Sequence, residues 1–242
     1  TSGDINVTGV GVVTATGALT GTSGDDEFTV SGNGALASLG MTFSDVSSVA
    51  GAGGTDAIVG TADSGWQLGA ESGSLSHAAI AFSGIAEASG GNGVVDGADT
   101  DTQYALASDG GLQASGIDFA DVTRVNAGAG ADQVTSASGE RWTLGSSTGS
   151  ASAAGVAFSG IEQISTQSAV VDASQNTGSE SFALSADSSE ISVFGLLFDS
   201  VAEVFAGGEG DNEVVSDAAS WQLVSGAGVS ANGVTFNGID RV

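Results

Sequence analysis

One eight-residue phrase occurs six times along the chain, and this repetition constrains the fold more than any other feature. Its clearest copies read AIAFSGIA at 79–86, GVAFSGIE at 155–162 and GVTFNGID at 233–240. The central Phe recurs at a nearly constant interval, at Phe43, Phe82, Phe119, Phe158, Phe198 and Phe236. Self-similarity at a period of about 20 to 50 residues is typical of solenoids and other repeat folds.

A second aromatic position precedes each phrase and alternates between two residue types. It holds Phe or Tyr in one copy and Trp in the next: Phe28, Trp66, Tyr104, Trp142, Phe182 and Trp221. Because Trp returns only at every second copy, the larger unit is a double repeat. We therefore expect a single continuous array: a partial repeat at 1–24, double repeats at 25–101 and 102–179, and a truncated double repeat at 180–242.

Apolar residues within each copy follow an i, i+2 spacing, which places both side chains on one face of a strand. WQL at 66–68 and VAF at 156–158 thus read as short strands, and the SG, NG or SD that follows four of the six Phe residues reads as a turn. The pattern predicts an all-β, parallel β-solenoid of half-repeats of about 38 residues. Stacked hairpins in a sandwich-like arrangement are the alternative, because WTLGSSTGSAS at 142–152 could close a hairpin.

Stacking at about 4.8 Å would align equivalent side chains of successive copies. We therefore expect the aromatic residues to form a continuous buried core ladder. Its clearest members are Trp66, Trp142, Trp221, Phe82, Phe158 and Phe236.

Composition excludes several classes of partner. The chain carries 29 acidic residues against three Arg and no Lys, so it lacks the cations that nucleic acids or anionic membrane surfaces would need. No apolar run approaches the roughly 20 residues that span a bilayer, and the first residues do not read as a signal peptide. Because the chain begins without Met, we expect it to be part of a longer protein and to contact neighbouring repeats of that protein.

Acidic, Gly-rich turns follow alternate phrases, as GAGGTDAIV at 51–59, GAGADQVT at 128–135 and GGEGDNEVV at 207–215. They resemble the nonapeptide of calcium-binding RTX repeats, and the resemblance implies Ca²⁺ ligands at Asp56, Asp132 and Asp211. Ca²⁺ takes six to eight oxygens, whereas one isolated turn supplies about three or four. The alternative, which we favour, is that these Asp residues are solvated turn residues.

Enzymatic chemistry has few candidate residues in this sequence. Asp96, Asp99 and Asp101 could act as paired carboxylates only if they converged in a groove. His77 is the single His, and we expect it on the surface because Ala153 stands at the matching position of another copy. No Cys nucleophile, GxSxG elbow or P-loop is present, so we expect no enzyme.

The W-x-L and G-V-x-F-S-G-I-E pattern over residues 25–242 resembles repeats of very large bacterial surface proteins, the filamentous-haemagglutinin-type and RTX-type adhesins and exoproteins. The resemblance implies a secreted, cell-surface rod or stalk that contributes to adhesion and biofilms, and it implies no catalytic residues. Two alternatives remain: a module whose lateral face binds carbohydrate or extracellular matrix, and a polysaccharide-acting enzyme. Phe194 and Phe205 lie outside the two aromatic slots, and we expect them to extend the core.

Overall fold

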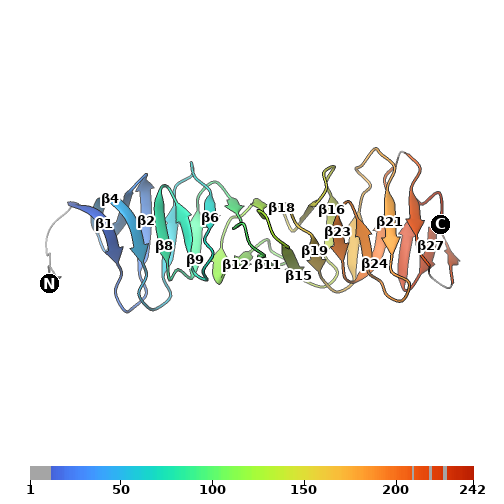
Figure 1. Cartoon of the computed structure of the whole chain (residues 1–242), viewed down its shortest axis with the longest axis horizontal. Coiled ribbons are helices and arrows are strands. Elements are labelled where there is room, and N and C mark those ends of the chain that lie inside the picture. Colours follow the sequence, from blue (N-terminus) through green and yellow to red (C-terminus); the bar gives the residue numbers. More distant parts are fainter. Residues whose placement is uncertain (1–11, 209, 218–219, 226–227) are drawn as a thin grey trace. The chain divides into compact units, whose positions relative to one another are not determined.

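The chain forms a β-solenoid of about seven turns, with parallel strand pairs predominating, which confirms the predicted fold class (Figure 1). A computed structural model describes residues 12–208, 210–217, 220–225 and 228–242. These residues form 28 strands and no helix. The described part of the chain accordingly contains no helix suited to crossing a membrane.

The strands belong to two compact units, which we call the N-terminal unit (Thr1–Val94 with Ser115–Ala120) and the C-terminal unit (Val95–Ala114 with Asp121–Val242). The N-terminal unit contains β1 (Val12–Thr20), β2 (Glu27–Gly32), β3 (Ala35–Ser38), β4 (Met41–Ala50), β5 (Ala57–Gly60), β6 (Trp66–Leu68), β7 (Leu75–His77), β8 (Ile80–Ser83), β9 (Glu87–Gly90) and β13 (Ile117–Phe119). β10 (Val94–Asp96) lies at the boundary.

The C-terminal unit holds the remaining strands. In chain order these are β11 (Gln103–Leu106), β12 (Leu112–Ala114), β14 (Arg124–Asn126), β15 (Gln133–Ser136), β16 (Arg141–Leu144), β17 (Ser150–Ala153), β18 (Val156–Ser159), β19 (Gln163–Ser165), β20 (Ala169–Asp172), β21 (Ser181–Leu184), β22 (Ile191–Val193), β23 (Leu196–Phe198), β24 (Val201–Phe205), β25 (Glu213–Val215), β26 (Gln222–Val224), β27 (Gly228–Ala231) and β28 (Val234–Asn237).

The repeated phrase forms the last strand of a three-stranded antiparallel meander. In β16, β17 and β18, Leu144 pairs with Ala151 and Ala151 pairs with Phe158. All three side chains are buried, because the i, i+2 spacing turns them to the same face. The N-terminal unit repeats the arrangement in β6, β7 and β8. The hairpins that the sequence offered as an alternative are therefore a component of the solenoid.

A two-residue turn with positive φ precedes each Phe strand. Its first residue has φ between 49° and 51° in all six copies: Leu39, Ala78, Ser115, Ala154, Phe194 and Asn232. Its second residue is Gly in five copies and Ala79, with φ 62°, in the other. Two consecutive positive φ values define the type I′ turn, whose twist matches the flanking strands. Phe194 therefore occupies a half-buried turn position.

Ala79 makes this turn testable, because an L-residue with positive φ carries strain of about 1–2 kcal/mol. Ala79→Gly should relieve that strain. The greater conformational entropy of Gly in the unfolded chain lowers the free energy of unfolding by about 0.4–1 kcal/mol. We expect a net gain of about 0.5–1 kcal/mol in urea denaturation, since the exposed Ala79 methyl group loses little contact on removal. Gly155→Ala, where an added Cβ meets no atom within 4 Å, should cost stability through φ alone. A loss of stability in Ala79→Gly would contradict the turn assignment.

Parallel pairing builds ladders that start and end with an aromatic side chain. Tyr104 of β11 lies in register with Val134, Ile164 and Phe198 of β15, β19 and β23. A second ladder joins β16, β20, β24 and β28, and its members are Trp142, Val171, Val204 and Phe236. In the N-terminal unit the corresponding set is Phe28, Ile58, Ala88 and Phe119. All of these side chains are buried and form the core.

The expectation that aromatic residues of successive copies stack on one another is wrong. Parallel partners such as Trp142 and Val171, or Ile164 and Phe198, are separated by less than one repeat of the sequence. Successive phrases therefore fall in two separate columns of strands, which we call the Trp column and the Phe/Tyr column after their first aromatic residues. The columns face each other across the core, since the Trp142 and Phe198 ring centroids are 6.5 Å apart.

The last meander of the C-terminal unit departs from the predicted core ladder. Leu223 of β26 is 90% exposed, whereas its counterpart Leu144 is 3% exposed, and Trp221 is only partly buried. β16 is covered on its outer edge by β20, but among the described residues β26 pairs only with β27. Trp66, Trp142, Phe82, Phe158 and Phe236 are buried.

Candidate functional site

In each unit, polar side chains that we call the edge ladder stand just before parallel strands of the Phe/Tyr column. Its members are Asp26, Asp56, Thr102, Asp132, Glu162, Glu180, Asn212 and Asp240. Asp132 Oδ1 accepts a hydrogen bond of 2.8 Å from the Thr102 N–H one turn earlier. Glu162 Oε2 accepts one of 2.7 Å from the Asp132 N–H. These two bonds tie three successive turns of the C-terminal unit to one another.

The residue that precedes an edge-ladder member can accept a hydrogen bond from the backbone of the following turn. Asp101 Oδ1 accepts from the Ala131 N–H at 2.8 Å, and Asp25 Oδ1 accepts from the Thr55 N–H at 2.7 Å. Hydrogen bonds from N–H groups to carboxylates are stronger than neutral ones. Residues 131 and 132 of one Gly-rich turn therefore exchange hydrogen bonds with residues 101 and 102 of the turn before it.

Three edge-ladder carboxyl groups are almost completely buried, and each has one oxygen without a protein partner. These oxygens are Asp56 Oδ2, Asp132 Oδ2 and Glu180 Oε1. Burial raises the pKa of Asp132, the charges of Glu162 and Asp101 add to this rise, and the Thr102 N–H opposes it. Burial likewise raises the pKa of Glu180, and the hydrogen bond from the Gly207 N–H opposes this rise.

Asn212 occupies the same edge-ladder position as Asp56 and Asp132 but satisfies its whole side chain. Its Oδ1 accepts from the Glu180 N–H at 3.1 Å. Its Nδ2 donates to the carbonyl oxygens of Gly207 and Gly238, at 2.9 and 3.2 Å. A neutral amide therefore fits this position without an unpartnered atom.

The residues expected to bind Ca²⁺ fall into two different positions. Asp56 and Asp132 belong to the edge ladder, but Asp211 precedes it by one residue and is exposed. The Asp211 N–H donates to Ser179 Oγ at 2.9 Å. In the described part of the chain, no three His, Cys, Asp or Glu side chains gather to hold a metal ion.

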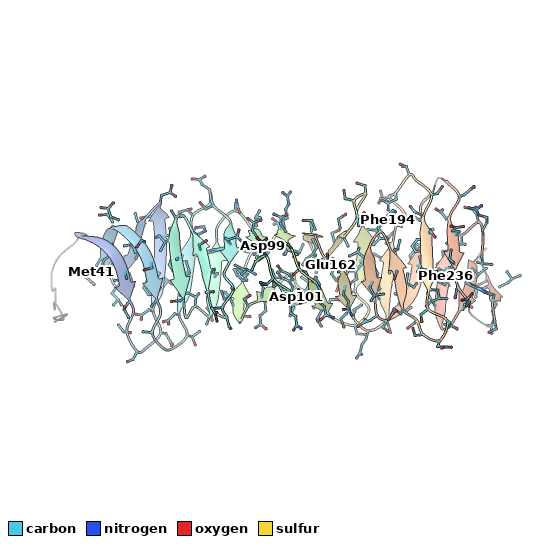
Figure 2. All side chains as sticks on the ribbon, viewed as in Figure 1. Met41, Asp99, Asp101, Glu162, Phe194 and Phe236 are labelled. Carbon is cyan, nitrogen blue, oxygen red and sulfur yellow. The ribbon has the colours of Figure 1, made fainter. Side chains whose placement is uncertain are left out.

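Two of the three carboxylates considered for catalysis have structural partners; Figure 2 labels Asp99 and Asp101. Asp96 Oδ1 accepts a hydrogen bond of 2.6 Å from Asn126 Nδ2, whereas Asp101 holds the Ala131 N–H. Asp99 is exposed. The first two carboxylates thus serve contacts between strands or turns.

The expectation that His77 lies on the surface is wrong. His77 is 2% exposed and stacks on Trp66, with ring centroids 4.2 Å apart. Its Nε2 accepts from the Thr61 N–H at 2.9 Å, so its Nδ1 carries the proton and donates to the Gly65 carbonyl at 2.9 Å. Burial lowers the pKa of His77 against the effect of that carbonyl. His77 therefore acts as a neutral core residue.

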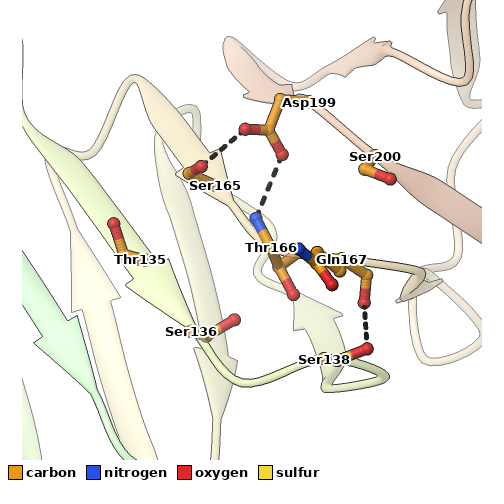
Figure 3. A pocket seen from close by; sticks show the side chains of 8 residues that line it. All are labelled: Thr135, Ser136, Ser138, Ser165, Thr166, Gln167, Asp199 and Ser200. Carbon is orange, nitrogen blue, oxygen red and sulfur yellow. Dashed lines mark hydrogen bonds between the residues drawn. The ribbon is translucent and has the colours of Figure 1, made fainter.

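A polar groove opens in the C-terminal unit where β15, β19 and β23 end (Figure 3). Its volume is about 470 Å³. The lining residues are Thr135, Ser136, Ser138, Ser165, Thr166, Gln167, Asp199 and Ser200. Sequence reasoning missed this groove, although Ser136 and Thr166 stand where the matching copy has Gly60 and Gly90.

The aromatic residues outside the repeat slots do not line this groove. Phe205 of β24 is half-buried and lies under the Arg141 guanidinium, which is 4.9 Å from its ring centroid. Arg141 also pairs with Asp172 at 2.6 Å.

Comparison of the chain with protein-family models, with curated proteins and with solved structures finds no match.

Proposed function

We propose that the chain is a structural and adhesive repeat module of an extracellular bacterial surface or biofilm-matrix protein, in which it serves as a rod or stalk. The observation that carries this proposal is the repeated use of one meander and one set of buried ladders within each unit. Repeats that contact only their neighbours can extend a chain without a central core. We assign no catalytic role and no required cofactor to the module.

The hydrogen bonds that acidic side chains accept from adjacent turns support the same proposal. The carboxylates of Asp25, Asp101 and Asp132 are engaged by backbone N–H groups of adjacent turns, which supports a role in stacking. The formal net charge of −26 would keep neighbouring rods apart and soluble. Neighbouring repeats of the parent protein are the partners that this role requires.

Small-angle X-ray scattering tests the rod. A compact globule of this chain length would have a radius of gyration of about 18 Å, and an unfolded chain about 54 Å. We expect a folded particle with a radius clearly above that of the globule and a pair-distance distribution skewed towards long distances. Circular dichroism on the same sample should report β structure, which distinguishes a rod from unfolded chain. A folded particle with the radius of a compact globule would overturn the proposal.

A further inference from the structure

The polar groove interrupts an otherwise regular repeat. Ser136, Thr166 and Gln167 stand one double repeat after three glycines of the N-terminal unit, Gly60, Gly90 and Gly91. Likewise, Asp199 follows the Phe of β23 where Ala120 follows the Phe of β13. Four side chains with hydrogen-bonding groups therefore replace Gly or Ala at one place.

The surroundings of Gly60 explain why the N-terminal unit lacks this groove. A Cβ on Gly60 would lie 2.7 Å from Trp66 Cη2 and 2.8 Å from His77 Nε2, so the imidazole leaves no room for a side chain. In the C-terminal unit Ala153 stands at the His77 position. The loss of the imidazole thus accompanies the gain of the Ser136 hydroxyl.

Hydrogen bonds fix the walls of the groove. Asp199 Oδ2 accepts from Ser165 Oγ at 2.5 Å, and its Oδ1 accepts from the Thr166 N–H at 3.0 Å (Figure 3). Ser138 Oγ donates to the Gln167 carbonyl at 3.1 Å. These contacts hold side chains from three neighbouring turns in one frame, as a preformed binding site requires.

Several polar groups of the groove retain hydrogen-bonding capacity. Ser136 Oγ has no hydrogen-bond partner but is covered from solvent. The Thr166 hydroxyl donates to the Ala137 carbonyl at 2.8 Å, so the accessible groups are Asp199 and Gln167. Each Asp199 oxygen accepts one bond but has two lone pairs, and the Gln167 side chain is exposed and offers both a donor and an acceptor. The groove can therefore both donate to and accept from a ligand rich in hydroxyl groups.

We propose that this groove binds a neutral carbohydrate, a short segment of a polysaccharide chain. None of its eight lining residues is cationic, and Asp199 is negative, so phosphate, sulfate and uronate groups would be repelled. Its lining lacks aromatic and large aliphatic side chains, which excludes a predominantly apolar ligand. Sites built to hydrogen-bond hydroxyl groups discriminate strongly for them. The inference rests on the proposed adhesive function and names the ligand class of that function.

Amide NMR titration of the full chain tests the site. The probes are neutral oligosaccharides of glucose, mannose and galactose, with oligogalacturonate as the anionic comparison. We expect at least one neutral oligosaccharide to shift amides of 135–138, 165–167 and 199–200, and oligogalacturonate to shift none of them. Gln167→Gly restores the glycine that the N-terminal unit has at this position, Gly91, removes the exposed amide donor and acceptor, and should weaken binding about tenfold or more. Asp199→Ala should do the same, and Ser192→Ala, on an exposed strand position outside the groove, should bind as the parent chain does.

The NMR titration and the scattering experiment test the groove proposal and the rod proposal separately. If no neutral oligosaccharide shifts these amides, or if the shifts lie elsewhere, the groove proposal fails whatever the scattering shows. Unchanged binding in both groove variants also overturns it. A compact particle that binds the sugar at the groove would overturn the rod alone. The fingerprint of dispersed amide peaks in each variant shows that the fold is retained.

Discussion

Gly130→Ala should destabilise the C-terminal unit by about 3 kcal/mol. Gly130 has φ +137°, a conformation that residues with a Cβ rarely adopt, which alone costs about 1–2 kcal/mol. An added Cβ would also lie 2.7 Å from both Asp101 N and Thr100 C of the preceding turn, and backbone cannot move aside as a flexible side chain can. The melting temperature should fall by about 6–12 °C, measured by circular dichroism.

The equivalent glycines and a matched control sharpen this result. Gly54 and Gly210 share the positive φ and the close approach to the preceding turn, so Ala at either position should be costly too. Gly178 lies in the loop next to Gly210. An added Cβ there meets no atom within 4 Å, so Gly178 should tolerate Ala. Equal melting temperatures for Gly130→Ala and Gly178→Ala would show that the glycine-rich turns are not required for stacking.

Asp132→Asn should stabilise the C-terminal unit by about 1–3 kcal/mol at pH 7.5, the range for an unsatisfied buried polar group. The amide keeps an oxygen for the Thr102 N–H and removes a buried charge next to Glu162 and Asp101. Asn212, at the same edge-ladder position, demonstrates that an amide fits. Asn212→Asp is the reverse experiment and should destabilise the unit, as measured by urea denaturation.

The gain from Asp132→Asn should depend on pH. Because the pKa of Asp132 is raised in the folded state, the folded chain binds its proton more tightly than the unfolded chain does. Stability of the parent chain should therefore rise as pH falls through the folded pKa towards about 4, the unfolded value, and the advantage of the variant should vanish there. An advantage that persists at pH 4 would contradict the assigned charge effect.

The same denaturation tests Ca²⁺ at this position. CaCl₂ and NaCl at equal ionic strength should stabilise the parent chain to similar extents if the carboxylates act only as hydrogen-bond acceptors between turns. A larger Ca²⁺ effect that disappears in Asp132→Asn would instead show a bound ion.

The strands and turns follow from the sequence because their signals are local. The i, i+2 pairs around Trp142 and Phe158 mark strands that the structure contains, and positive φ at Gly84 and Gly160 confirms the predicted turns after the Phe. In the fifth copy Asp199 and Ser200 occupy these positions without positive φ, and both line the groove.

The stacking register could not be derived in the same way. The repeat period tells which segments resemble each other, but not which segments pair. Tyr104 lies beside Val134 and not beside Trp142, the next copy of its own slot, because the parallel partner comes earlier in the sequence than that copy. The alternation of Phe or Tyr with Trp was the available signal, since the two residue types mark the two columns.

Two features of the candidate sites could not be derived from the sequence. Asp211 aligns by residue type with Asp56 and Asp132, whereas the backbone places Asn212 at their position. The groove depends on strand ends from three turns meeting at Ser136, Thr166 and Asp199, which no single stretch of sequence reveals.

The two columns also limit how a gene for such a chain can change length. A deletion of a single copy would transfer every later copy to the opposite column and place Trp where the neighbouring coils accommodate Phe or Tyr. Deleting or duplicating two copies leaves each indole among its original neighbours. Recombination between repeats should thus be tolerated only in steps of a whole double repeat, and natural variants should differ by even numbers of copies.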